Sequence, residues 1–147
     1  MKEAAIDIPF STVQLTIQRV VKVTSLGSLN ETLAEMGLAS SAQEQLWVVS
    51  LDSLNQIRSV TVASIGTYHE CYVSVPNVIS PVLLSATDRF IMAHNHPNGR
   101  PNPTADDIDL TKRVAVAAEA MDLAFDDHII VTPTGEWRSM RALGHLV

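Results

Sequence analysis

Two β-rich runs, LWVVSLD at 46–52 and IRSVTVASI at 57–65, are separated by only four residues in this chain. Runs of β-branched and aromatic residues on either side of a short polar segment are typical of neighbouring strands. A third apolar run, RFIMAH at 89–94, predicts a short buried strand. The pattern therefore predicts a sheet whose first part is a hairpin or meander over 46–65.

Both ends of the chain predict further strands. The run at 10–23 mixes β-branched and polar residues at alternating positions, which suits a strand more than a helix. The tail HIIVTPTGEWRSM at 128–140 has strand-like residues on both sides of a Pro-Thr-Gly segment. This arrangement predicts a closing β-hairpin.

Helical patterns separate these strands. In 28–38 we expect a short helix with Asn30 as its N-cap and Gly37 at its end. In 104–121 apolar residues recur at helical spacing and aspartates crowd the first turn, which predicts a longer helix. A third helix, within NVISPVLLSA at 77–86, would be interrupted or capped by its internal proline. The sum is a mixed α/β fold.

Length and composition favour one soluble domain. The 147 residues are 46% hydrophobic and 18% charged, an ordinary globular balance at the size of a single core. The net charge of −6 gives no general attraction to phosphate backbones, so direct nucleic-acid binding is not supported by charge. One cysteine excludes an internal disulfide, and no apolar stretch reaches the roughly 20 residues of a membrane span. We expect a cytoplasmic protein.

The chemistry is concentrated in HNHPNGRPNPTADD at 94–107. His94 and His96 are two residues apart at the end of a predicted strand, so both side chains point to the same face and can share one ion. Asp107, in the first turn of the next helix, is a candidate third ligand. Two nitrogens and one carboxylate oxygen leave a fourth tetrahedral position open, which is the layout of a catalytic zinc site.

A simpler interpretation exists for part of this pattern. Thr104, followed three residues later by Asp107, is also a helix capping pattern that needs no metal. Two histidines near a turn are common by chance. The combined pattern of two histidines, a hydroxyl and a carboxylate in fixed order is much rarer, and it favours a metal site.

The pattern HxHPx6TxxD over 94–107 resembles the JAMM signature of JAB/MPN domain metalloproteases, in which Ser usually stands at the position of Thr104. The run HNHPNGRPNPTADDIDLTKR is more specifically similar to RadC-like proteins, as are IGT at 65–67 and DHIIV at 127–131. The resemblance covers roughly residues 44–140. It implies the JAB/MPN (cytidine-deaminase-like) architecture, a mainly antiparallel sheet flanked by helices. Residues 1–43 would then be an N-terminal extension packed on a domain of residues 44–147, forming one globular unit.

The resemblance also implies a mechanism. In the family, a water at the open zinc position attacks an amide carbonyl, and a glutamate at the start of an early strand takes its proton. The matching residue is Glu44, with Glu35 and Glu70 as weaker candidates and a solvated surface charge as the alternative role of Glu44. Thr104 would donate its hydroxyl to the developing oxyanion.

The function implied is a zinc-dependent peptidase or isopeptidase with an unidentified substrate. The alternatives are a DNA-repair or mobile-element associated protein of the RadC-like type, acting as nuclease or adaptor, and a scaffold without chemistry. Retention of all three ligands favours the enzyme.

The remaining distinctive residues suit structural roles. We expect His128 to be a packed or hydrogen-bonded histidine, and His69 and His145 to be exposed, with none of the three on the metal. Cys71 is expected to be buried or idle. The tryptophans at 47 and 137 are expected to pack on strands.

Overall fold

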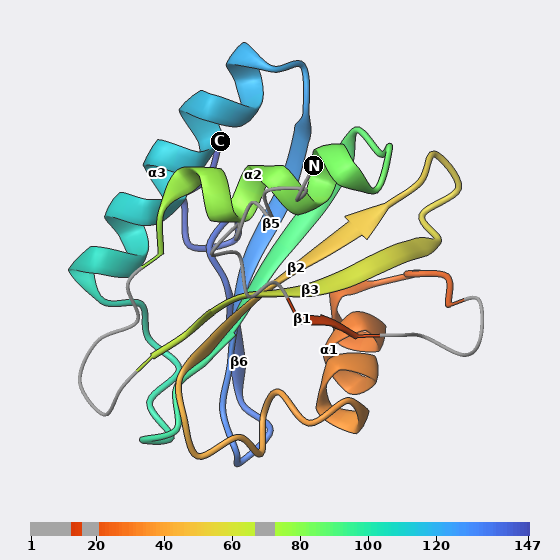
Figure 1. Ribbon diagram of the computed structural model, residues 1–147. Coiled ribbons are helices and arrows are strands. Elements are labelled where there is room, and N and C mark those ends of the chain that lie inside the picture. The colour runs from red at the N-terminus through yellow and green to blue at the C-terminus, as the bar shows by residue number, and fades with distance from the viewer. Residues whose placement is uncertain (1–12, 16–20, 67–72) are drawn as a thin grey trace, which may run out of the picture.

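The computed structural model describes residues 13–15, 21–66 and 73–147. This part of the chain forms a six-stranded sheet and three helices (Figure 1). No helix within it is long and apolar enough to cross a membrane. The elements in chain order are β1 (Val13–Leu15), α1 (Leu26–Glu35), β2 (Gln45–Leu51), β3 (Ile57–Ile65), α2 (Val75–Leu84), β4 (Arg89–Asn95), α3 (Ala105–Ala120), β5 (Ala124–Val131) and β6 (Trp137–Ser139).

The sheet is mixed and mainly antiparallel, as predicted. Its strands lie in the order β1-β3-β2-β4-β5-β6. Only β4 and β5 run parallel, and the other neighbouring pairs are antiparallel. A parallel pair needs a crossover connection, which α3 provides between these two strands. The parallel pair brings the C-terminal ends of β4 and β5 side by side.

Helices cover both faces of the sheet (Figure 1). On one face Leu29 and Leu33 of α1 pack in a buried cluster with side chains of β2, β3, β4 and β5. On the opposite face Val78 of α2 and Val114 of α3 pack in a second cluster with side chains of β2, β4 and β5. The described residues therefore form three layers, with α1 on one side of the sheet and α2 and α3 on the other.

Alternation along β4 decides which of its side chains reaches which layer. Phe90 and Met92 belong to the cluster under α2 and α3, whereas Ala93 belongs to the cluster under α1. Because side chains of a strand alternate between the two faces, His94 follows Met92 toward α3 and Asn95 follows Ala93 toward α1. Both side chains are buried.

The first helix begins earlier than predicted. Its N-cap is Ser25, whose hydroxyl oxygen accepts from the Ser28 backbone N–H at 3.1 Å, while the Ser28 hydroxyl oxygen accepts from the Ser25 N–H at 3.2 Å. Asn30, the predicted N-cap, lies inside the helix, so that prediction was wrong. The reciprocal serine pair satisfies free N–H groups of the first turn, which Asn30 cannot do from its later position. Gly37 follows the helix end with a φ of 99°, as expected of a terminating glycine.

The second helix is neither interrupted nor capped by Pro81. It starts after the N-cap Ser74 and runs from Val75 to Leu84 with Pro81 inside. Proline removes one helical hydrogen bond, which usually bends or ends a helix. Here Pro81 and Val82 are both buried residues of the helix, and Val82 packs in the cluster between the helix and the sheet. We attribute the continuity to this packing against the sheet.

The remaining elements follow the prediction closely. The strands over 46–52, 57–65 and 89–94 are β2, β3 and β4, and the helix over 104–121 is α3. The tail forms the antiparallel pair β5 and β6, closed by a turn with a hydrogen bond from Thr132 N–H to the Glu136 carbonyl. Of the strand predicted over 10–23, the structure describes β1 and a bridge from Lys22 to Gln56, and the rest lies outside the described residues.

Candidate metal centre

Two histidines at the end of β4 point their Nε2 atoms at each other. His94 is in β4 and His96 follows the strand, and the two Nε2 atoms are 2.8 Å apart. A backbone hydrogen bond from His96 N–H to the Val131 carbonyl, 2.9 Å long, extends the pairing of β4 and β5 to this residue. Both rings are buried, with 3% and 4% of their residues' surfaces exposed. The alternation predicted from the sequence therefore places both imidazoles at one point.

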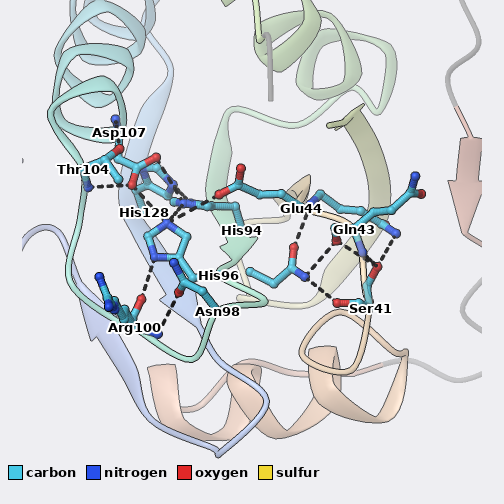
Figure 2. Close-up of polar contacts among 12 residues, drawn as sticks. Ser41, Gln43, Glu44, His94, His96, Asn98, Arg100, Thr104, Asp107 and His128 are labelled. Carbon is cyan, nitrogen blue, oxygen red and sulfur yellow. Dashed lines mark hydrogen bonds and ion pairs between the residues drawn. The ribbon is translucent and has the colours of Figure 1, made fainter. Parts of the chain in front are cut away.

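Asp107 reaches the same point from the first turn of α3 (Figure 2). Its Oδ1 is 3.2 Å from His94 Nε2, and its Oδ2 is 3.1 Å from His96 Nε2. Asp107 is held in place by a capping box with Thr104: Oδ2 accepts from the Thr104 N–H at 2.8 Å, and the Thr104 hydroxyl oxygen accepts from the Asp107 N–H at 3.2 Å. The helix start thus fixes this carboxylate between the two rings.

Glu44 approaches the histidines from the other side (Figure 2). It immediately precedes β2, and β2 pairs with β4 so that Leu46 is opposite His94. Two residues further along this antiparallel register, Glu44 comes beside His96, with Oε1 3.6 Å from Nε2. One ligand atom each from Glu44, His94 and His96 lie within 4.8 Å of one another. The Glu44 side chain is 29% exposed, whereas that of Asp107 is 16% exposed, so Glu44 lies at the rim of the site.

Asn95 holds the segment that carries Glu44. Its side-chain oxygen accepts from the Gln45 N–H at 2.7 Å, and its amide nitrogen donates to the carbonyls of Gln43 at 3.0 Å and Ser41 at 3.2 Å. The amide therefore binds the backbone on both sides of Glu44. Asn95 itself is fully buried, so the side-chain end of each of these hydrogen bonds is shielded from water.

Each histidine has a second partner on its Nδ1. His96 Nδ1 is 2.7 Å from the carbonyl oxygen of Arg100, in the loop between β4 and α3. A carbonyl can only accept, so Nδ1 of His96 carries a proton, and in the neutral ring Nε2 then has the free lone pair. His94 Nδ1 is 2.7 Å from Nε2 of His128, a fully buried residue of β5.

The charges of the site shift its pKa values in opposite directions. Burial opposes ionisation of Asp107, but hydrogen bonds from His94 and His96 outweigh it and hold the pKa of this carboxyl far below its ordinary value. For His96, burial lowers the pKa. The hydrogen bonds to Asp107 and to the Arg100 carbonyl, together with the negative charges of Asp107 and Glu44, outweigh burial and raise this pKa above 6.5. Burial lowers the pKa of His128 well below 6.5, and the proximity of His94 adds to this.

The donor set fits a divalent cation. Two imidazole nitrogens face each other at 2.8 Å, with two carboxylates next to them. Four groups with lone pairs directed at a common point repel one another unless a proton or a cation lies between them. Nitrogen and carboxylate donors of this kind are typical ligands of zinc and related metals.

The structure brings most of the predicted site residues together. His94, His96, Asp107 and Glu44 converge, and Thr104 lies at the N-terminus of α3 as the cap of the same helix. Glu35, a weaker base candidate, ends α1 on the opposite face of the sheet, and Glu70 lies outside the described residues. His69 and Cys71 also lie outside them.

Other residues of the site were missed or only partly foreseen. His128 is buried and hydrogen-bonded, as expected, but its partner is a candidate ligand. The role of Asn95 was not predicted, although its position between His94 and His96 in an extended segment places its side chain on the other face. His145 is half-buried rather than exposed, and it lies in the C-terminal turn, where its N–H donates to the Met140 carbonyl. The tryptophans at 47 and 137 both pack in or against the cluster under α1, as predicted.

Comparison with known proteins identifies relatives of this chain. Residues 23–145 match the family model described as the RadC-like JAB domain. A UPF0758 protein of Trichodesmium erythraeum is 35% identical over 104 residues, which cover 71% of this chain and 42% of that protein. UPF0758 proteins of Latilactobacillus sakei and Chloroflexus aurantiacus are 34% and 30% identical over 110 and 113 residues, covering 75% and 77% of this chain and 49% of each relative.

These matches define the extent of the likeness. The chain spans about half the length of the curated relatives it matches. The family match begins at Val23, before α1, so it extends further toward the N-terminus than the resemblance over 44–140. With a matching family model over most of its length and the candidate ligands in place, this chain belongs to the RadC-like JAB domain family.

Proposed function

We propose that this protein is a zinc-dependent hydrolase that cleaves a peptide or isopeptide bond. One observation carries the proposal: two buried imidazole Nε2 atoms and the Asp107 carboxylate meet at one point, with a second carboxylate, Glu44, at the rim. A metal site used for hydrolysis needs three protein ligands and an open position beside a base. The arrangement supplies a candidate for each part.

Zinc is the metal that these donors favour. Two neutral imidazoles and one carboxylate are a common zinc set in hydrolases, and hard cations such as Mg²⁺ prefer oxygen ligands. When bound, zinc would lower the pKa of a water molecule and polarise the substrate carbonyl. All other steps of the reaction fall to side chains of the chain itself.

The geometry favours Asp107 as the ligand and Glu44 as the base. The Asp107 oxygens are closer to the imidazole nitrogens, at 3.1 and 3.2 Å against 3.6 Å for Glu44, and its helix turn holds it firmly. A base must accept a proton from the attacking water and then deliver it to the leaving amine nitrogen, which suits the more exposed carboxylate. Asn95 holds the backbone of Glu44 in register for this task.

Thr104 is the candidate donor to the carbonyl oxygen of the substrate. Its hydroxyl oxygen accepts the Asp107 N–H, and this contact leaves the hydroxyl proton for another acceptor. The side chain is exposed to solvent at the start of α3. A hydroxyl in that position can donate to an oxygen on which negative charge develops.

The charge around the site favours an amide over a phosphodiester. Asp106 and Asp109 are exposed on the same helix turns as Asp107, and Glu44 lies on the other side of the histidines. These carboxylates belong to a protein with a net charge of −6, which has no general attraction to a nucleic-acid backbone. A peptide or isopeptide bond carries no charge, so its approach is not opposed in this way.

The test compares Glu44→Gln with Glu35→Gln. The purified proteins are analysed for metal and then assayed against isopeptide, peptide and DNA substrates. We expect about one zinc per chain in all of them, hydrolysis of an amide substrate by the wild type, and loss of nearly all turnover in Glu44→Gln only. Glu35 provides the matched control because it lies on the opposite face of the sheet.

Three results would contradict the proposal. A protein that stays metal-free when supplied with zinc has no such site. Cleavage of DNA without cleavage of any amide substrate would indicate the nuclease alternative. Loss of zinc in Glu44→Gln, together with retained zinc in Asp107→Asn, would exchange the roles assigned to the two carboxylates.

A further inference from the structure

A buried line of hydrogen bonds connects two of the three candidate ligands, Asp107 and His94, through α3 and β5. It starts at the Asp107 carbonyl, which accepts from the Thr111 hydroxyl at 2.7 Å. Thr111 Oγ1 is 2.7 Å from His128 Nδ1, and His128 Nε2 is 2.7 Å from His94 Nδ1. Thr111 and His128 are fully buried, and His94 nearly so.

The Asp107 carbonyl determines which atom donates in each hydrogen bond of this line. A carbonyl oxygen only accepts, so the single hydroxyl proton of Thr111 points at Asp107. Otherwise two oxygen atoms without a proton between them would face each other at 2.7 Å. The hydroxyl oxygen must then accept from His128, which places a proton on Nδ1 of that ring.

The next step fixes His94. The two hydrogen-bond partners of His128 are a ring nitrogen and a hydroxyl, so neither offers a negative charge to stabilise a cationic ring in the protein interior. His128 is therefore neutral, its Nε2 is a lone pair, and His94 must donate to it from Nδ1. The free lone pair of His94 is then on Nε2, which is the atom that faces His96 and Asp107.

We infer that His128 and Thr111 are positioning residues for the metal centre, because they fix the tautomer and ring orientation of His94 so that its Nε2 is presented as a ligand. His96 needs no such help, since the Arg100 carbonyl fixes its tautomer directly. The line also starts at the backbone of Asp107, so it joins the first turn of α3 to the end of β4. The inference rests on the metal site of the proposed function, but not on the bond that is cleaved.

The test uses two pairs of variants. Thr111→Val removes the hydroxyl at nearly constant shape, and Thr111→Ser keeps it. His128→Phe fills the interior without an acceptor, and His128→Gln restores a carbonyl oxygen that can accept from His94. Circular dichroism checks that each variant is folded, and the two threonine variants suffice if His128→Phe does not fold.

Two readouts separate positioning from packing. In the metal-free protein at alkaline pH, long-range ¹H–¹⁵N correlation spectra should show His94 protonated on Nδ1 in the wild type and Thr111→Ser. Zinc affinity, measured by competition with a chelator, should fall about 10- to 100-fold in Thr111→Val and His128→Phe. It should stay within a few-fold of wild type in Thr111→Ser and recover in part in His128→Gln.

The inference is overturned if His94 of the wild type is protonated on Nε2, or if folded Thr111→Val and His128→Phe bind zinc as tightly as the wild type. Failure of the proposed function is a separate result. A protein that binds zinc with the predicted losses in these variants, yet cleaves no amide, would support the positioning role and refute only the peptidase assignment.

Discussion

Thr104 has two possible roles that substitution can separate. Its hydroxyl oxygen caps α3 by accepting the Asp107 N–H, and the proposed reaction also uses its proton at the substrate oxygen. If it only caps, Thr104→Ala should cost about 1 kcal/mol of stability, and Thr104→Asn should restore most of that. If it also acts on the substrate, Thr104→Ala should lower turnover ~100-fold with zinc content intact, whereas Thr104→Ser should keep activity.

We expect both losses in Thr104→Ala. Thermal or denaturant unfolding gives the first, and turnover per bound zinc gives the second. A lower melting temperature with unchanged turnover per zinc would show that the hydroxyl serves the helix alone. A loss of bound zinc would instead show that the cap is needed to hold Asp107 between the histidines.

His96 predicts how metal binding depends on pH. Its pKa is raised above 6.5 in the metal-free protein, so protonation of His96 stabilises the folded state below pH 6.5 and this contribution is lost as pH rises through the raised pKa. Zinc must displace the same proton. As the pH is lowered, the apparent zinc affinity should therefore begin to fall while the pH is still above 6.5. Below that onset it should fall about tenfold per pH unit for each displaced proton.

Competition with a chelator across pH 5.5 to 8.5 measures this dependence. Glu44 is one of the carboxylates that raise the pKa of His96, so Glu44→Gln should move the onset to lower pH. An affinity that does not change over this range would mean that His96 is not a ligand. If the fall in affinity began at the same pH in Glu44→Gln as in the wild type, the charge of Glu44 would have no effect on the pKa of His96 in solution.

At the scale of elements, Asn95 joins the end of β4 to the start of β2. Asn95→Ala should destabilise the protein by about 1–3 kcal/mol, because it leaves the Gln45 N–H and two carbonyls without their buried partner. It should also lower kcat while zinc content stays near wild type, since Glu44 loses its backbone support and the ligands do not. Unfolding curves, metal analysis and steady-state kinetics measure the three quantities.

Gln43→Ala is the matched control for that prediction. Asn95 binds the Gln43 backbone carbonyl, which the substitution keeps, and the Gln43 side chain is exposed. A kcat unchanged in Asn95→Ala would mean that Glu44 either needs no such support or is not the base. Loss of zinc in Asn95→Ala would mean that the hydrogen bonds of the Asn95 amide also hold His94 and His96 in place.

The elements differ in how far the sequence could predict them. β2, β3 and α3 have strong local patterns, and alternation along β4 was enough to place His94 and His96 on one face. The start of α1 was missed because Ser25 and Ser28 cap it through a reciprocal pair, a weaker signal than a lone asparagine near an apolar run. The helix through Pro81 depends on burial against the sheet, which local propensity does not contain.

The site was predictable only where its parts are close in sequence. His94, His96, Thr104 and Asp107 fall within one short segment whose spacing indicates a metal. The contact of His94 with His128 spans 34 positions and depends on the parallel pairing of β4 and β5. Glu44 was placed by family resemblance, and its approach to His96 depends on the register of β2 against β4. Pairings of this kind follow from the fold.

At the scale of the whole molecule, α1 closes one face of the sheet. Its Leu29 and Leu33 are almost fully buried, in a cluster that includes Trp47 of β2 and Ile91 of β4. The family match also includes α1, since it begins at Val23. We therefore propose that the second half of the predicted extension over 1–43 is integral to the core, and that the chain unfolds as one unit.

Substitutions on the two faces of the sheet test this unity. Leu33→Ala, under α1, should cost about 2–5 kcal/mol, and Val114→Ala, under α3, should also be strongly destabilising because both side chains are fully buried. Both should shift one cooperative transition seen alike by circular dichroism and tryptophan fluorescence. Leu54→Ala, at a side chain 63% exposed, is the control and should change stability by less than about 0.5 kcal/mol. If Leu33→Ala instead produced an early transition that left the Val114 side of the sheet folded and zinc-binding, α1 would be a separate extension docked on a domain complete without it.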